Sequence, residues 1–357
     1  MINDNSNLNK TGLTSSVSST KSFSIANNGN IFDILSNKIY ERPIEAIVRE
    51  VYSNAIDANI AAKSTGGIKV TLPSSGNPVL IIEDNGIGMS DEKITEVYTQ
   101  YGNSDKGNDN SQIGGFGIGC KTPFAYTDQF TVVSWQNGIK NSYIAIKNDN
   151  GPELIRTASV ECEPNTSGTI VTVPVMEEDI GEFYRAAVKV FLFAKEFPIL
   201  NDYNAFLNEA KQYISNLETI EDFLKLREKI ANSNLISLNE NTIGARLLNV
   251  DTNNTVLIEI GGVVYTVSSS TVWNNFYNGY VILHAPVGEL SVQASREKLN
   301  YDKKTTAKLE EIFNETVKKI IFDVKNMVEN KSFSTGDRIK KILEFNIDKL
   351  SMLENVA

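Results

Sequence analysis

Cysteine and histidine are scarce in this sequence. Its 357 residues include two cysteines, Cys120 and Cys162, and one histidine, His284. Neither cysteine belongs to a Cys-x-x-Cys pair, so we expect neither a zinc site nor a disulfide framework. Such sparse cysteine usage is typical of a reducing compartment, and we expect a cytoplasmic location.

The sequence also lacks a basic balance and long apolar runs. It has 34 Lys and Arg residues against 44 Asp and Glu, a formal net charge of -10. Nucleic-acid phosphates are bound by basic patches, so wrapping nucleic acid is not expected to be its main work. The longest apolar run, "AAVKVFLFA", carries Lys189 and is far shorter than the roughly 20 residues of a membrane helix. We therefore expect no transmembrane segment, and any membrane association would have to come through a partner.

The composition is that of a folded protein, with 41% hydrophobic and 22% charged residues. Residues 1–22 are rich in Ser, Asn and Thr and lack the apolar core of a secretory signal; we predict a flexible N-terminal arm. Residues 23–176 alternate helical and strand patterns and are expected to form one domain. Within it we predict helices at 41–62 and 91–101, strands at 68–73, 78–84, 130–135, 141–146 and 168–175, and a polar loop at 102–119.

Residues 177–357 are expected to form a second domain. Helical periodicity occupies 177–197 and 204–231, strand-like runs follow between 244 and 295, and two amphipathic helices are predicted at 303–330 and 336–354. The chain shows no internal repeat. The class predicted for the whole is therefore α+β.

The first chemical motif is on the early helix. Glu50, Asn54 and Asp57 are spaced by four and three residues, which places them on one stripe of the helix. A carboxylate followed by an amide at the margin of a core could hold a water and a metal ion. The alternative is a solvated helix face with no chemical role.

The second motif is "EDNGIGMS", residues 83–90, in which a hydrophobic strand runs into Asp84, Gly86 and Gly88. The carboxylate could accept a hydrogen bond from an exocyclic amine, and the glycines would let a flat ring lie against the backbone. A plain turn after a strand is the alternative. A further Thr, Thr169 in "SGTIVTV", stands at the start of a strand, where threonine is common.

The third motif is the stretch "IGGFGIGCKTPFAYTDQF", residues 113–130. Glycine clusters suit close approach of a ligand to the backbone, and a glycine-rich loop before a helix start makes an anion cradle. Lys121 would add a point charge for phosphate; a flexible surface loop is the alternative. A bulky residue in place of Gly117 should then weaken binding of that ligand, as calorimetry would show.

Taken in order, the motifs resemble the GHKL ATP-binding (Bergerat) fold shared by gyrase B subunits, the large heat-shock chaperones, MutL and histidine kinases. "REVYSNAIDA" resembles the family's N box, "DNGIGM" and "GGFGIG" its glycine boxes, and Gly168–Thr169 its third box. The resemblance covers about residues 30–175. It implies an α/β sandwich that binds ATP and Mg²⁺, followed by a transducer-like middle domain.

The resemblance also assigns roles. Glu50 would be the general base, Asn54 the Mg²⁺ ligand, and Asp84 the adenine acceptor, assisted by Thr169 through a water. Residues 101–119 would form the ATP lid, while Asp57 is interpreted as a structural partner. The remaining nucleotide contacts implied are Gly86, Gly88, Met89, Lys106, Gly114, Gly115, Phe116, Gly117, Ile118, Gly119 and Lys121.

The segment "VQASREKLNYD", residues 292–302, resembles the chaperones' loop "SREML", whose Arg senses the γ-phosphate. Arg296 is therefore the candidate sensor, with Lys298 as the second choice. The alternative is a helix N-cap at Ser295 followed by solvated residues. His284 lies in the later strand region, so the histidine-kinase branch, which needs a phosphorylated His before the ATP domain, is not expected.

A narrower resemblance links "KTPFAYTD" and the N-box region to phage rapid-lysis proteins of the rIIA type. It implies a protein of the host-cell cytoplasm that affects lysis or host defence through host or phage partners. We expect an ATPase that converts ATP and water to ADP and phosphate, and acts as a conformational switch. An ATP-dependent homodimer joined by the N-terminal arms is predicted. The alternatives are a non-hydrolysing, nucleotide-gated adaptor and, less favoured, a DNA protein like MutL or a topoisomerase.

Overall fold

The structure is a computed structural model that describes residues 38–100, 118–148, 151–232, 235–238, 243–248, 255–267, 280–329 and 334. The predicted N-terminal arm, residues 101–117 of the predicted lid and the predicted helix at 336–354 lie outside the described residues. Within the described part, no helix combines the length and apolar character needed to span a membrane.

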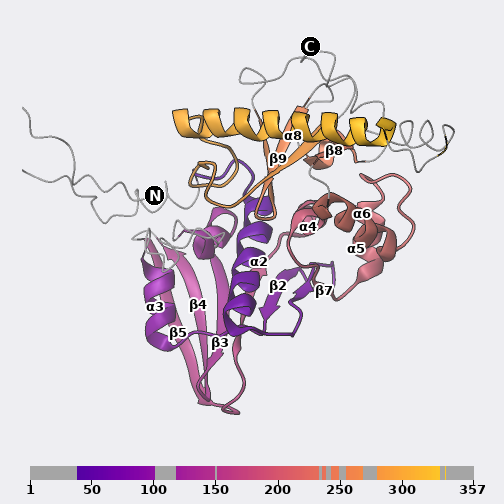
Figure 1. The fold of residues 1–357 in the computed structure, drawn as a ribbon. Coiled ribbons are helices and arrows are strands. Elements are labelled where there is room, and N and C mark those ends of the chain that lie inside the picture. The colour runs from indigo at the N-terminus through magenta and orange to yellow at the C-terminus, as the bar shows by residue number, and fades with distance from the viewer. Residues whose placement is uncertain are drawn as a thin grey trace, which may run out of the picture.

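The first layer is a seven-stranded sheet with the order β5-β4-β3-β6-β2-β1-β7 (Figure 1). Its neighbours are antiparallel except for the parallel pair β1–β7. Along β2, half-buried and buried residues alternate strictly, as in a strand with one face on a core. The strands are β1 (Lys69–Thr71), β2 (Val79–Asp84), β3 (Gln129–Gln136), β4 (Ile139–Asn148), β5 (Gly151–Glu161), β6 (Gly168–Pro174) and β7 (Ile199–Leu200).

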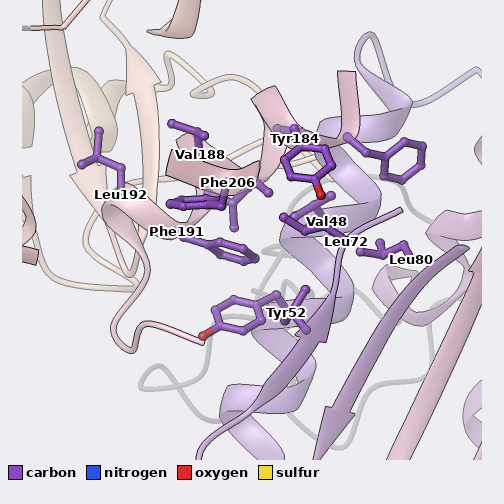
Figure 2. Packing of buried hydrophobic residues seen from close by; sticks show 14 of the residues in the cluster. Val48, Tyr52, Leu72, Leu80, Tyr184, Val188, Phe191, Leu192 and Phe206 are labelled. Atoms are coloured by element: carbon purple, nitrogen blue, oxygen red, sulfur yellow. The ribbon is translucent and has the colours of Figure 1, made fainter. Parts of the chain in front are cut away.

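Helix α2 (Pro43–Ala62) confirms the helix predicted at 41–62. Pro43 occupies the first turn, where its missing N–H costs nothing, and Lys63 ends the helix with a left-handed φ of 51°. The buried face includes Val48 and Tyr52, which Figure 2 shows within the hydrophobic cluster. The short helices α3 (Asp91–Thr99) and η2 (Gly119–Ala125), the latter of 3-10 type, complete this part.

The hydrophobic core continues past the predicted domain boundary at 176/177. After the 3-10 turn η3 (Glu177–Asp179) come α4 (Ile180–Phe193), α5 (Tyr203–Ala210) and α6 (Ile220–Asn232), and their apolar faces join the same buried cluster as α2 (Figure 2). Strand β7 pairs with β1 through Ile199 and Leu200. Residues 177–232 thus pack as part of the first unit. The single helical stretch predicted at 204–231 is two helices, separated by turns.

A second sheet has the order β10-β9-β11-β8. The long helix α8 (Lys303–Glu329) packs on it and confirms the helix predicted at 303–330 (Figure 1). Leu309 and Ile312 of α8 share a second buried cluster with Ile258 and Leu283 of the sheet. The remaining elements are β8 (Leu235–Leu238), α7 (Ala245–Leu248), β9 (Thr255–Ile260), β10 (Val263–Thr266) and β11 (Tyr280–Ala285).

Truncation of Phe191 tests whether α4 packs in the same hydrophobic cluster as α2. Its side chain is fully buried, and its ring centroid lies 4.9 Å from that of Tyr52 on α2. We expect Phe191→Ala to lower the free energy of unfolding by about 3–5 kcal/mol, because it leaves a cavity between α4 and α2. Phe322→Ala, at a position 62% exposed on α8, should change it by no more than about 0.5 kcal/mol. Equal urea-unfolding midpoints for the two variants would contradict this assignment.

Candidate functional site

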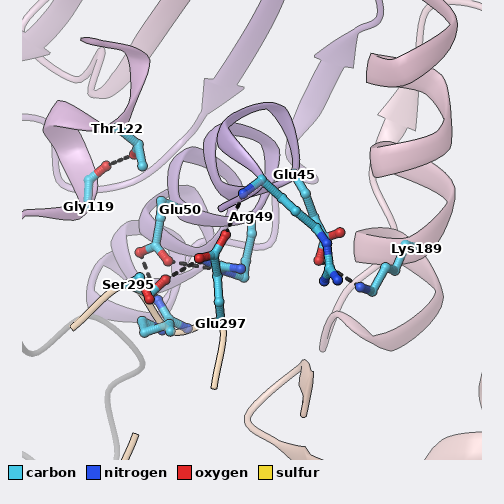
Figure 3. A network of polar contacts seen from close by, with 10 residues as sticks. Glu45, Arg49, Glu50, Gly119, Thr122, Lys189, Ser295 and Glu297 are labelled. Carbon is cyan, nitrogen blue, oxygen red and sulfur yellow. Dashed lines mark hydrogen bonds and ion pairs between the residues drawn. The ribbon is translucent and has the colours of Figure 1, made fainter. Parts of the chain in front are cut away.

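Glu50 is a buried carboxylate on the second turn of α2. It is 4% exposed and lies between two guanidinium groups (Figure 3). Arg49 Nε lies 3.0 Å from Glu50 Oε1, and Arg296 Nη1 lies 2.8 Å from Oε2. Arg49 also donates through Nη2 to the Ser295 carbonyl at 2.7 Å. The predicted base and the predicted sensor therefore meet directly, although 246 residues separate them.

The charge state of Glu50 follows from these neighbours. Burial alone would raise the pKa of its carboxyl, but Arg296 and Arg49 outweigh that effect and hold the pKa below its usual range. Glu50 is therefore ionised at neutral pH. Arg49 was not among the predicted site residues. Its position directly before Glu50, on the face of the helix turned toward the core, is the sequence feature that could have predicted it.

The backbone at Gly119 lies against Glu50. A Cβ built on Gly119 would come within 2.8 Å of Glu50 Oε2, so only glycine fits here without displacing the carboxylate. Asn54, one turn further along α2, is half-buried, as is Asp57. The helix thus places Glu50 and Asn54 on one stripe, as their spacing predicts.

Asp84 ends β2 and is 9% exposed. Its Oδ1 accepts hydrogen bonds from the backbone N–H groups of Gly86 at 2.8 Å and Thr169 at 3.1 Å. Burial raises the pKa of this carboxyl to about 6, and the two N–H bonds only partly oppose that effect. Both bonds use Oδ1, so among the residues that the structure describes no hydrogen bond occupies the second carboxylate oxygen, which can accept from an amine donor.

Ser134 on β3 connects the segments around Asp84 and is fully buried. Its hydroxyl accepts from Met89 N at 2.9 Å, donates to the Gly168 carbonyl at 3.0 Å and lies 3.1 Å from Thr169 Oγ1. The sequence motifs did not include it. A polar residue at the inward position after Phe130 and Val132 was the signal that could have found it.

The glycines of "DNGIGM" are required by protein packing. A Cβ on Gly86 would meet Ala58 of α2 at 2.5 Å, and one on Gly88, whose φ is +62°, would meet the Trp135 carbonyl at 1.9 Å. Gly168, with φ +136°, would collide with the Asp84 carbonyl at 2.3 Å. Packing within the protein thus requires these glycines, because they let α2, β2, β3 and β6 approach closely; the space that Gly86 and Gly88 leave for a flat ring stays a prediction.

Lys121 lies away from the role predicted for it. It is 2% exposed, and its Nζ donates to the carbonyls of Val97 at 2.6 Å and Gln100 at 2.7 Å. These carbonyls close the end of α3, where a cation is favoured. In this arrangement Lys121 fixes α3 to η2, so the expected phosphate contact does not match its position.

Several predicted contacts lie outside the described residues, namely Lys106, Gly114, Gly115, Phe116 and Gly117. Ile118 is half-buried and precedes η2. Arg296 is 5% exposed and has a left-handed φ of 55°. Lys298, the second choice as sensor, is an exposed residue paired with Glu41.

The fold and the site define a class of protein before any relative is considered: an α/β sandwich with a buried carboxylate on its covering helix and an aspartate at a central strand end. Residues 40–169 match the family model described as histidine kinase-, DNA gyrase B- and HSP90-like ATPase. Residues 40–169 are therefore similar to ATPase domains of this class, and the predicted α+β fold class is confirmed.

Curated relatives match at low identity. The chain is 27% identical over 174 residues to the chaperone protein HtpG of Rickettsia canadensis, which covers 42% of this chain and 27% of that protein. It is 26% identical over 178 residues to the B subunit of the type 2 DNA topoisomerase 6 of Sulfurisphaera tokodaii, covering 46% of this chain and 33% of the relative. The chain thus spans about a quarter to a third of the length of these relatives.

Asp84→Asn tests how much the ionisation of the buried Asp84 carboxyl destabilises the fold, because the variant removes the charge and keeps a hydrogen-bond acceptor. Because the folded-state pKa of Asp84 is raised, its stabilising contribution is complete below about pH 4 and is lost as the pH rises through about 6. The asparagine keeps an oxygen acceptor and never ionises. We expect its free energy of unfolding, relative to wild type, to rise by about 2 kcal/mol between about pH 4.5 and about pH 7.5. A difference that stays constant in urea titrations at the two pH values would contradict the raised pKa.

Proposed function

We propose that this chain hydrolyses ATP in a Mg²⁺-dependent reaction and uses the cycle as a conformational switch. The observation that carries the proposal is the ionised, buried carboxylate of Glu50, held against Gly119 and directly paired with Arg296. In the proposed arrangement Glu50 orients and deprotonates the attacking water. Phosphoryl transfer requires this kind of positioning and charge neutralisation more than covalent chemistry.

The base end of the nucleotide is assigned to the end of β2. Asp84 accepts from the adenine amine through the oxygen that Gly86 and Thr169 leave available. Thr169, fixed by Ser134, supports the same edge through a water. The contacts proposed for Gly86, Gly88 and Met89 are backbone contacts along the turn after β2.

Asn54 is the proposed Mg²⁺ ligand. Mg²⁺ is commonly held by one or two protein oxygens together with substrate phosphates, and a half-buried amide one turn from Glu50 is a suitable donor. When bound, the ion would neutralise phosphate charge. Asn54 orients it on the same side of the helix as the proposed base.

Arg296 is proposed to bind either of two anions, the Glu50 carboxylate or the γ-phosphate of ATP. With no phosphate present it neutralises Glu50; with ATP bound, its guanidinium turns to the γ-phosphate and leaves Glu50 able to accept a proton. This exchange supplies the differential contact that a ligand-driven switch requires. Lys298 remains the second choice for this contact.

A second function is favoured by one specific observation. The two guanidinium groups hold the pKa of Glu50 low, which makes it a weak base while they stay in place. If Arg296 never leaves, the chain is a nucleotide-gated adaptor that binds ATP without turnover and acts through protein partners. The narrower proposals, a role like that of the phage rIIA-type proteins, host or phage partners and an ATP-dependent homodimer, stay predictions of the sequence.

Glu50→Ala distinguishes the two functions. We expect turnover to fall by at least about 100-fold, because a general base contributes about that much or more, while ATP affinity measured by calorimetry stays within about threefold. Asp57→Asn, on the same stripe of α2, is the control and should retain turnover. Wild-type binding without turnover would select the adaptor, and loss of binding in the Glu50 variant would remove its assignment as base.

Asp84→Asn should weaken ATP binding, whereas Glu50→Ala should lower turnover and leave binding nearly unchanged. The amide offers an N–H where the adenine amine needs an acceptor, or leaves that amine without a partner, so we expect ATP affinity to fall by about tenfold or more. The variant should stay folded, since both backbone bonds to Oδ1 can be kept. Unchanged affinity for ATP in the folded variant would move the base end of the nucleotide away from Asp84.

A further inference from the structure

The N-terminus of α2 has an unusual cap. Its N-cap residue is Arg42, whose side chain makes no capping hydrogen bond, whereas Ser, Thr, Asp or Asn is preferred at this position. In a capping box, the acidic residue three positions later reaches back to the N-cap N–H. Glu45 occupies that position, but its carboxylate is directed to Lys189 on α4, at 2.8 Å. The usual local partner of the Arg42 N–H is therefore engaged elsewhere.

Glu297 supplies the missing acceptor from 255 residues away. Its Oε1 accepts from the Arg42 N–H at 2.8 Å, and its Oε2 accepts from the Glu41 N–H at 2.8 Å (Figure 3). Carboxylate-to-N–H bonds at a helix start are charge-assisted, and a negative charge there also interacts favourably with the helix dipole. Glu297 is half-buried, but Glu41 and Arg42 are exposed, so solvent screens part of this attraction.

The neighbours of Glu297 are anchored to the same two turns of α2. Arg49 binds the Ser295 carbonyl at 2.7 Å, Arg296 pairs with Glu50 at 2.8 Å, and Lys298 pairs with Glu41. Ser295 and Arg296 thus contact the second turn of α2, and Glu297 and Lys298 contact the two residues that precede its first turn. Of these contacts, those of Glu297 are the ones that bind backbone N–H groups at the helix start.

We propose that Glu297 is a positioning residue that seats the 295–298 loop on the start of α2 and thereby keeps Arg296 beside Glu50, from where its guanidinium can turn to the γ-phosphate. The proposal rests on the function proposed above, since the loop matters to turnover only if Glu50 and Arg296 take part in it. Glu297 touches no reacting atom. Its effect is to make the hydrogen bond to the N-cap N–H of α2 depend on the loop that carries Arg296, so that bond is present only while the loop is docked.

The decisive experiment combines amide exchange with kinetics on the full chain. In Glu297→Ala we expect the Glu41 and Arg42 amides to exchange at least about fivefold faster, followed by hydrogen-exchange mass spectrometry, because a helix cap contributes about that factor. The kcat for ATP should fall by about fivefold or more. The KM should change little, since Glu297 contacts neither the proposed general base Glu50 nor the proposed nucleotide contacts around Asp84. Glu297→Gln keeps one oxygen acceptor and should fall between wild type and the alanine variant on both readouts.

Glu311→Ala on α8 is the matched control, because it is the same substitution at a residue outside the proposed site and removes only an exposed ion pair with Lys308, which contributes little. It should leave both readouts near wild type. Unchanged exchange at Glu41 and Arg42 in Glu297→Ala would overturn the docking role. Faster exchange with unchanged kcat, where Arg296→Ala lowers kcat, would overturn the positioning role. If wild type shows no turnover, the hydrolysis proposal fails, and the exchange readout alone decides whether Glu297 docks the loop.

Discussion

The burial of one carboxylate constrains the rest of this structure. Glu50 sits in the interior at 4% exposure, where an unpaired charge costs several kcal/mol. Arg49 on the same helix supplies one counter-charge, and Arg296 on a loop far along the chain supplies the other. Since neither partner alone satisfies both carboxylate oxygens, the position of the 295–298 loop and the charge balance of the site are linked. Removing either guanidinium leaves buried charge incompletely compensated.

The two ends of the site are built differently. The end around Asp84 is made within the first sheet, where Gly86, Gly88 and Gly168 allow backbones to approach so closely that a methyl group would collide. Ser134 then ties three segments together. The end around Glu50 needs a loop from outside that sheet. Under the proposed function, recognition of the adenine would therefore not require the docked loop, whereas activation of the water would, so ATP binding and turnover would be separable properties.

Much of the fold could be predicted from local patterns, because α2 and α8 carry long apolar stripes and β2 alternates strictly. The ordered motifs also led to Glu50 and Asp84. β5 was not predicted, since most of its residues are exposed and its pattern has no apolar face. Arg49, Ser134 and Glu297 act through partners far along the chain, and spacing carries no information on such contacts. Lys121 was misplaced because a cation after a glycine-rich loop also fits a helix end, here that of α3.

Which guanidinium can leave Glu50 decides what the site can do. The backbone of Arg49 is part of α2, and its guanidinium donates a hydrogen bond to the Ser295 carbonyl. Arg296 has a left-handed backbone, with φ at 55°, a conformation that costs a non-glycine residue roughly 1–2 kcal/mol. Its place beside Glu50 is thus maintained by its contacts against a backbone preference. Under the proposed function, Arg296 is therefore the partner that a triphosphate would draw away, because it comes from a loop and lacks the second contact that Arg49 makes with the Ser295 carbonyl.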